Sequence, residues 1–208
     1  MEFILISKPD TTDHQTEIDC VMKGFAAGLQ IFHLRKPDAT EAEVELWLNN
    51  IATEYHPEIV LHQHFRLAHS YQVKGIHLPE KTREIASIQD YRKIFPGRTV
   101  STSCHNVAEL LHLTAYDYVF LSPVFDSISK QGYLANINFH AASSEIRKIK
   151  QQYGRCRIFA LGGVSVERIA TLKNHQFDGI AVLGAVWESS DPLLQIKQFI
   201  RAVNLSRD

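Results

Sequence analysis

The segment R-I-F-A-L-G-G at 157–163 decides the fold, together with G-I-A-V-L-G-A at 179–185. Each is a short apolar run of strand length that ends in glycine, where a helical pattern begins. Two such junctions are typical of the last two strands of a (β/α)8 barrel, where backbone N–H groups hold a phosphate that glycine allows to come close. The residues predicted to bind this phosphate are Gly162, Gly163, Gly184 and Ala185. Relief of crowding at tight turns is the alternative role of the glycines.

Short apolar runs alternate with longer amphipathic stretches along the rest of the chain. The runs cover residues 3–7, 30–35, 58–62, 75–78, 99–103, 117–122, 157–162 and 179–183. This alternation predicts βα units in a parallel sheet, and eight consecutive units favour a closed barrel over an open doubly wound sheet. We therefore predict an α/β fold, a single (β/α)8 TIM barrel with short helices over residues 1–208.

Several helix starts are marked by residues that cap a helix N-terminus. Thr40 and Glu43 have the spacing of a capping box. Asn106 and Glu109 have the same spacing, and Ser165 is a good N-cap before an amphipathic stretch. The helices must be brief, because 208 residues is near the lower limit for this kind of barrel.

Composition and charge limit the classes of partner. The chain is 45% hydrophobic and 22% charged, as expected for an ordinary globular domain, and its formal net charge of −1 predicts neither a nucleic-acid groove nor an anionic membrane surface as partner. The three cysteines are odd in number and lack metal-type spacing, so they predict no disulfide framework and no zinc knuckle. A proline and an aspartate interrupt the apolar run at 3–6 too soon for a signal peptide or a membrane span. We expect a cytoplasmic protein.

Histidines stand at the ends of four consecutive predicted strands, where the chemistry of such a barrel lies. They are His33, His62, His77 and His105. His33 and His77 also fit an alternative in which they point inward, fill the barrel and form hydrogen bonds with a neighbour. His105 differs, because it lies between a strand end and the Asn106 cap, where its side chain faces the cavity. An imidazole at that place can transfer a proton near neutral pH.

Basic side chains at or near the same rim predict an anionic small molecule as ligand. They are Arg35, Lys36, Lys81 and Lys130. Solvated surface lysine is the alternative for Lys36 and Lys81. Lys130 follows the Ser127 and Ser129 hydroxyls in S-P-V-F-D-S-I-S-K, within the long aperiodic stretch 122–138. Hydroxyls and an ammonium group together can bind a phosphate or pyrophosphate, and a long loop at the barrel mouth can cover a substrate.

Six short motifs in register make the chain resemble the thiamine phosphate synthase family, which includes the thiazole tautomerases. The family pattern is Q-x-R-x-K, N-D, G-V-H-L-G-Q-x-D, S-x-H, G-P-x-F-x-T-x-T-K and A-I-G-G-I, in this order. Here the motifs are H-L-R-K-P from His33, H-Q from His62, G-I-H-L-P-E-K-T from Gly75, S-C-H from Ser103, S-P-V-F-D-S-I-S-K from Ser122 and A-L-G-G-V from Ala160. The match runs over nearly the whole chain.

The resemblance implies that a thiazole phosphate binds with its phosphate on the glycine segments. In the synthase, Mg²⁺ holds the pyrophosphate of an aminopyrimidine substrate through two aspartates, which fall at Gln63 and Thr82 here. Neither an amide nor a hydroxyl supplies the lost charge. The asparagine of the family is replaced by His62 and its strand-2 lysine by Pro37, so the pyrophosphate site is weakened in several places. Lys36 or Lys81 is the expected compensation.

The tautomerase branch, as the resemblance implies, shifts a proton within a thiazole carboxylate phosphate, with the histidine after strand 5 as acid and base. His105 is at that position, Ser103 beside it can orient the carboxylate, and the reaction needs no metal. We therefore favour the tautomerase, with no cofactor, over the synthase with Mg²⁺, although Ser127 and Ser129 keep the hydroxyls typical of the synthase loop. The catalytic residues predicted are His105, Ser103, Arg35 and Lys130, and the further ligand-binding residues are Ser127, Ser129, His33 and His62.

Two other hypotheses remain. His33, His62 and His77 can be ligands of a metal-dependent hydrolase, although no acidic partner or activating base is evident at these strand ends. Alternatively, a catalytically silent barrel binds thiazole or thiamine phosphate as a sensor. The expected partners are a phosphorylated thiazole and, in the synthase alternative, an aminopyrimidine pyrophosphate. We expect no nucleic acid and no membrane, and a homo-oligomer stays open.

Overall fold

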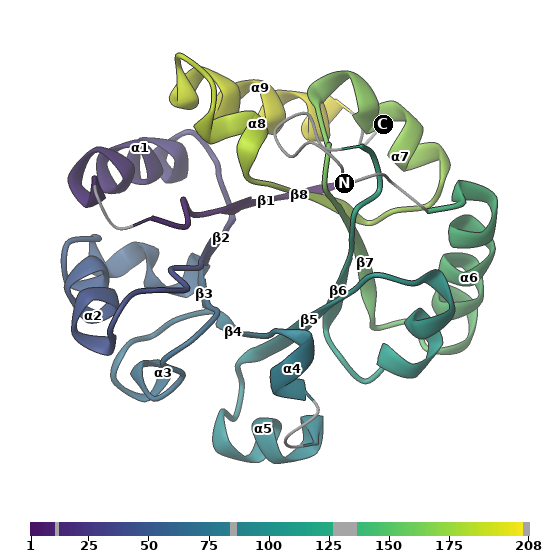
Figure 1. Cartoon of the computed structure of the whole chain (residues 1–208), viewed down its shortest axis with the longest axis horizontal. Coiled ribbons are helices and arrows are strands. Elements are labelled where there is room, and N and C mark those ends of the chain that lie inside the picture. Colours follow the sequence, from purple (N-terminus) through teal and green to yellow (C-terminus); the bar gives the residue numbers. More distant parts are fainter. Residues whose placement is uncertain (11–12, 84–86, 127–136, 206–208) are drawn as a thin grey trace.

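The computed structural model describes residues 1–10, 13–83, 87–126 and 137–205. Eight parallel strands pair in sequence order and close into a barrel through β1 and β8 (Figure 1). They are β1 Glu2–Ile6, β2 Ile31–Leu34, β3 Ile59–Leu61, β4 Gly75–Leu78, β5 Thr99–Cys104, β6 Tyr118–Leu121, β7 Arg157–Leu161 and β8 Gly179–Val182. The predicted (β/α)8 barrel is confirmed, and each strand lies within a residue or two of its expected bounds.

Helices form the outer layer around the ring of strands (Figure 1). The α-helices are α1 His14–Ala26, α2 Glu41–Asn49, α3 Leu67–Ser70, α4 Glu80–Arg83, α5 Ile88–Ile94, α6 Phe139–Gln152, α7 Ile169–Asn174, α8 Gly184–Trp187 and α9 Pro192–Leu205, and the 3-10 helices are η1 Thr53–Glu58, η2 Val107–Leu113 and η3 Val166–Arg168. Most are brief, as the chain length predicts. No helix in the described part of the chain has both the length and the apolar character needed to cross a membrane.

All three predicted cap residues stand at the N-cap of a helix, and two of them make a side-chain cap hydrogen bond. Thr40 and Glu43 form the full capping box of α2. Asn106 accepts a hydrogen bond from the backbone N–H of Ala108, but the element that follows is the 3-10 helix η2. Ser165 is the N-cap residue of η3, as predicted, but its side chain makes no cap hydrogen bond there. The Ser165 hydroxyl bonds the Glu167 carboxyl instead and lowers the pKa of that carboxyl.

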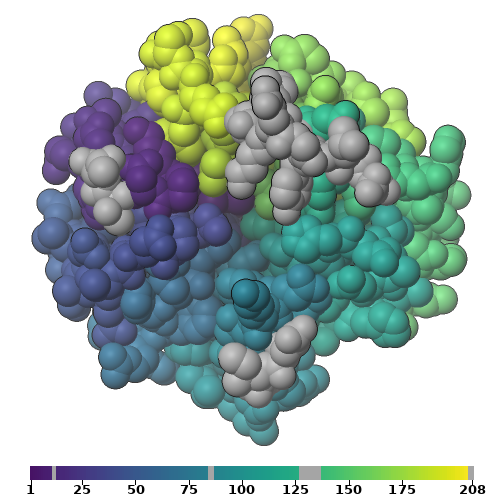
Figure 2. All heavy atoms as spheres, in the orientation of Figure 1, coloured from purple at the N-terminus to yellow at the C-terminus, as the bar shows by residue number. Residues whose placement is uncertain are grey.

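Strand alternation decides which side chains fill the barrel. Residues two apart along a strand point to the same face, so Ile31, His33 and Arg35 face inward in successive layers. The apolar part of the interior consists of Ile4, Ile6, Ile31, Val60, Tyr118, Phe120, Phe159 and Ala181. A second apolar layer lies between the strands and the helices. Figure 2 shows atoms filling the centre that the ribbon drawing leaves open. A ligand can therefore bind only above this packed interior, at one end of the barrel.

Candidate active site

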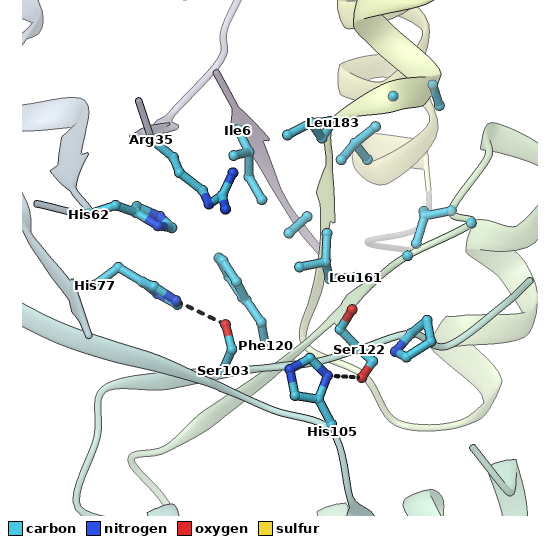
Figure 3. A pocket seen from close by; sticks show the side chains of 18 of the residues that line it. Ile6, Arg35, His62, His77, Ser103, His105, Phe120, Ser122, Leu161 and Leu183 are labelled. Atoms are coloured by element: carbon cyan, nitrogen blue, oxygen red, sulfur yellow. Dashed lines mark hydrogen bonds between the residues drawn. The ribbon is translucent and has the colours of Figure 1, made fainter. Parts of the chain in front are cut away.

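A pocket of about 760 Å³ opens at the C-terminal ends of the strands (Figure 3). Its walls combine apolar side chains from β1, β7 and β8 with polar side chains that follow β2 to β6. Of the residues predicted to act on or bind a ligand, the structure brings eight to this pocket: Arg35, His62, Ser103, His105, Gly162, Gly163, Gly184 and Ala185. Ser127, Ser129 and Lys130 lie outside the described residues.

The glycine segments lie on one side of the pocket, and crowding requires glycine at two positions. Gly162 and Gly163 have φ values of 93° and 61°, in the region that side chains disfavour. A Cβ atom on Gly162 would lie 2.8 Å from Cβ of Pro123, and one on Gly163 would lie 2.5 Å from the carbonyl oxygen of Asp126. The alternative role of relieving crowding is therefore real here. Because neither glycine has a side chain, the backbone of both residues faces the pocket, which a phosphate site also requires.

His105 lies at the rim with an exposed side chain and one fixed ring nitrogen. Its Nδ1 lies 2.7 Å from the carbonyl oxygen of Ser122 (Figure 3). A carbonyl oxygen only accepts hydrogen bonds, so Nδ1 carries the hydrogen. In the neutral ring the lone pair is then on Nε2. The sharp turn after β5, between Cys104 and the Asn106 cap, places this side chain at the pocket as the sequence predicted.

His33, His62 and His77 come together at the floor of the pocket. Nδ1 of His33 lies 2.8 Å from Nε2 of His62, and Nε2 of His33 lies 2.7 Å from the Tyr118 hydroxyl. His62 and His77 stack with ring centroids 4.2 Å apart, and both line the pocket. His33 does not line it, so it reaches a ligand only through His62. Burial lowers the pKa of all three imidazoles, and the pKa of His77 falls to about 3, so the rings are neutral at pH 7.

Hydrogen bonds occupy every ring nitrogen of His33, His62 and His77 except Nδ1 of His62 among the described contacts. The three residues offer ligand atoms within 4.8 Å of one another. Both nitrogens of His33 are bonded, and His77 bonds the hydroxyls of Ser101 and Ser103, each at 2.9 Å. The geometry therefore matches the inward-pointing, hydrogen-bonded alternative for His33 and His77.

Arg35 extends into the upper part of the pocket between His62 and Ile6 (Figure 3). Its backbone is held by Ser7, whose hydroxyl donates to the Arg35 carbonyl and accepts from the Arg35 N–H, both at 2.8 Å. The guanidinium group is one of the causes that lower the pKa of His62 and His77. The positive charge of Arg35 therefore acts at the floor of the pocket, where it favours the binding of an anion.

The expected compensation by Lys36 was wrong. Lys36 is buried, with its Nζ 2.5 Å from a carboxylate oxygen of Glu17 in α1 and 2.7 Å from the carbonyl oxygen of Asp10. Glu17 also accepts a hydrogen bond from the backbone N–H of Lys8. This buried pair faces the helical layer, and its ammonium group has no access to the pocket. Lys81 is exposed on α4 and does not line the pocket either.

Gln63 and Thr82, which stand where the resemblance places two aspartates, lie outside the pocket lining. The Gln63 amide donates to the carbonyl oxygen of Lys36. In the part of the chain that the structure describes, the carboxylates that line the pocket are Glu80 and Glu188, and Glu80 pairs with Arg83 at 3.0 Å.

Comparison with known proteins decides the family. The chain matches the family described as thiamine monophosphate synthase over residues 3–186. It belongs to that family. The resemblance drawn from the six motifs is thereby confirmed, and membership makes the chain an enzyme of thiamine biosynthesis.

Relatives with the name thiamine-phosphate synthase include one from Bacteroides fragilis, 24% identical over 90% of this chain and 95% of its own length, and one from Streptococcus suis, 25% identical over 84% and 77%. Among solved structures, thiamine phosphate pyrophosphorylase from Bacteroides thetaiotaomicron is similar, with a TM-score of 0.76 and 28% identity over 99% of this chain and 98% of that one. The 3-hexulose-6-phosphate synthase barrel shares the fold, at 13% identity, a TM-score of 0.68 and coverage of 97% and 99%.

Several polar residues in and below the pocket were not predicted from the sequence, among them two carboxylates and two hydroxyls. Glu80 and Glu188 line the pocket, and Tyr118 and Ser101 bond the histidines beneath it. The alternation along β6 and β5 was a usable signal for the last two, because Tyr118 is two residues before Phe120 and Ser101 two before Ser103. Glu188 follows the short helix α8, where no periodicity indicates its direction.

Proposed function

We propose that the pocket binds a phosphorylated thiazole and that His105 moves a proton within it, as in the tautomerase branch of the family. The phosphate would lie on the backbone of Gly162, Gly163, Gly184 and Ala185. The lining of the pocket supports this placement, because the glycine segments and His105, labelled in Figure 3, line the same cavity. A phosphate on the glycines would leave the ring of the ligand over the floor made by His62, His77 and Phe120.

The observation that carries the proposal is the hydrogen bond between His105 and the Ser122 carbonyl. It fixes the tautomer in which Nε2 is a base, and the exposed ring exchanges protons readily with water. Nε2 would accept a proton from one atom of the ligand ring and return it to another, so one imidazole serves as base and then as acid. Arg35 would bind the carboxylate of the ligand in a bidentate manner, and Ser103 would bond the same group. Lys130, Ser127 and Ser129 stay predicted contacts of the ligand.

The residues present do not fit the Mg²⁺ site of the synthase. Mg²⁺ prefers hard oxygen ligands, usually carboxylates together with substrate phosphates. The Gln63 side chain is already used as a donor to the Lys36 carbonyl, and Thr82 offers only a hydroxyl. Of the carboxylates lining the pocket among the described residues, Glu80 is paired with a guanidinium group. We therefore assign no step to a metal.

The second candidate is the synthase reaction, which joins an aminopyrimidine pyrophosphate to the thiazole phosphate. The names of the relatives favour it over the tautomerase, because those given for the similar family members are thiamine-phosphate synthase or pyrophosphorylase. The side chains of this chain favour proton transfer instead, since the carboxylates for Mg²⁺ are replaced. A cytoplasmic location stays a prediction.

Both reactions should be assayed on one preparation, with and without Mg²⁺. We expect isomerisation of the thiazole carboxylate phosphate at the same rate with and without Mg²⁺, lost in His105→Asn and retained in His112→Asn, an exposed histidine of η2 outside the pocket. Fast, Mg²⁺-dependent formation of thiamine phosphate without isomerisation would assign the synthase reaction. Binding of the ligand without either reaction would assign the sensor, and metal analysis of the purified protein tests the hydrolase.

A further inference from the structure

A chain of hydrogen bonds runs from the barrel interior to the pocket. It links the hydroxyl of Tyr118, both ring nitrogens of His33, and Nε2 of His62, with contacts of 2.7 and 2.8 Å. Tyr118 and His33 are buried in the barrel, whereas His62 lines the pocket. The chain therefore connects a ligand-facing ring to two residues that no ligand touches.

The number of hydrogens available ties the tautomers of both imidazoles to the group that receives the Tyr118 hydrogen. Burial holds the pKa of Tyr118 well above its ordinary value, so its hydroxyl keeps a single hydrogen, and a neutral imidazole also has only one N–H. The Tyr118 hydroxyl also has the Ser101 and Thr99 hydroxyls as hydrogen-bond partners, and we take the order in which Tyr118 donates to His33. With Tyr118 donating to Nε2 of His33, the hydrogen of His33 is on Nδ1 and points at Nε2 of His62. Nε2 of His62 must then be the acceptor, and the hydrogen of His62 is on Nδ1.

That Nδ1–H is available to a ligand. Among the described residues Nδ1 of His62 has no hydrogen-bond partner, yet it is not one of the fully buried polar atoms that lack one. It is therefore accessible from the pocket that His62 lines, on the same side as Arg35 (Figure 3). A guanidinium group and a neutral N–H donor side by side suit a carboxylate or phosphate oxygen, because both groups donate and one also supplies charge.

We propose that Tyr118 and His33 are positioning residues that hold His62 in its Nδ1–H tautomer, so that His62 donates a hydrogen bond to the anionic group that Arg35 binds. This assignment deepens the proposed function, and it rests on that function only for the identity of the anion. The sequence supports a specific role, since imidazoles at 33 and 62 stand where the family pattern has amide side chains. An amide always offers a donor and an acceptor, whereas an imidazole offers one of them according to its tautomer.

The tautomer is measurable without any substrate, by long-range ¹H–¹⁵N correlation of protein labelled in histidine. His62→Asn, which restores the residue of the family pattern, identifies the signals of His62 by their loss. In the parent protein we expect a protonated Nδ1 and an unprotonated Nε2 for His62. In Tyr118→Phe, which removes one oxygen and keeps the ring, we expect the His62 signals to shift to a mixture of both tautomers. Tyr71→Phe is the matched control, because it removes a hydroxyl that bonds Asn49 in the helical layer, and it should leave the His62 signals unchanged.

Binding is then tested with inorganic phosphate and with acetate as probes. Acetate should shift the Nδ1–H signal of His62 in the parent protein, and this shift should be lost in Arg35→Gln. A His62 ring protonated on Nε2, or a Tyr118→Phe protein with an unchanged His62 tautomer, would overturn the proposal. An acetate-induced shift that persists in Arg35→Gln would overturn the shared anion site. None of these results depends on turnover, so an inactive enzyme with the expected tautomer would count against the proposed function alone.

Discussion

Replacing Gly163 by alanine should separate the two roles of the glycine segments, because the chain contains a matched control. Gly163 and Gly97 have similar backbone conformations, with φ values of 61° and 75°. A Cβ on Gly97 meets nothing within 4 Å, whereas a Cβ on Gly163 lies 2.5 Å from the Asp126 carbonyl oxygen and 2.8 Å from Cβ of Phe125. Gly97→Ala therefore introduces backbone strain alone, and Gly163→Ala introduces the same strain together with a clash.

The magnitudes follow from these distances. An alanine in the left-handed region costs about 1–2 kcal/mol, which lowers Tm by roughly 2–8 °C in a chain of this size. In Gly163→Ala the segment at Phe125 and Asp126 must also move by several tenths of an ångström, and overpacking of this kind adds about 1–3 kcal/mol. We expect Gly163→Ala to unfold at a lower urea concentration than Gly97→Ala, with a free energy of unfolding smaller by about 1–3 kcal/mol. Equal losses in the two variants would refute the crowding argument.

The same pair of variants tests the phosphate site. A shift of the 163 backbone moves its N–H away from a bound phosphate, so Gly163→Ala should weaken a phosphorylated thiazole far more than its dephosphorylated form in calorimetric titrations. Gly97→Ala should leave both affinities unchanged, because Gly97 does not line the pocket. Equal weakening of both ligands by Gly163→Ala would show that the phosphate does not bind at the glycines.

Three further predictions concern side chains. His105→Asn should lower the rate of thiazole isomerisation by ~10²- to 10⁴-fold with ligand affinity nearly unchanged, measured by steady-state kinetics and titration, and a parent-like rate would show that another group is the base. Glu17→Gln should destabilise the fold by about 3–5 kcal/mol in urea unfolding, because it leaves the Lys36 ammonium buried without its charged partner, and Glu17→Leu combined with Lys36→Met should recover most of that loss. The pKa of His77, lowered to about 3, means that between pH 6.5 and pH 3 only the unfolded chain binds this proton. The free energy of unfolding should then fall by up to ~1.4 kcal/mol per pH unit as the pH drops through this window, and His77→Gln should reduce the slope.

The barrel and most of its mouth were predictable because they depend on local periodicity. Apolar runs with the period of a strand gave the eight strands within a residue or two, and the ends of those strands gave Arg35, His62 and Ser103 at the pocket. Burial of Lys36 was not predictable in this way. Lys36 follows β2, whereas its partner Glu17 is in helix α1, 19 residues earlier in the chain. A lysine next to a strand end looks the same in the sequence whether it faces water or a buried carboxylate.

The replacements at the mouth change its charge in a way that bears on the reaction. Gln63 and Thr82 remove two negative charges relative to the family pattern, while Arg35 keeps its positive charge at the pocket. The buried imidazoles on the floor add no charge at neutral pH, since burial keeps them unprotonated. A divalent cation at the positions of the two lost aspartates would thus meet an amide and a hydroxyl, whereas a small anion would be favoured by the Arg35 guanidinium at the same mouth. This balance of charge, more than the retained motifs, is why we expect this barrel to bind the anionic groups of its ligand directly and to transfer a proton with His105.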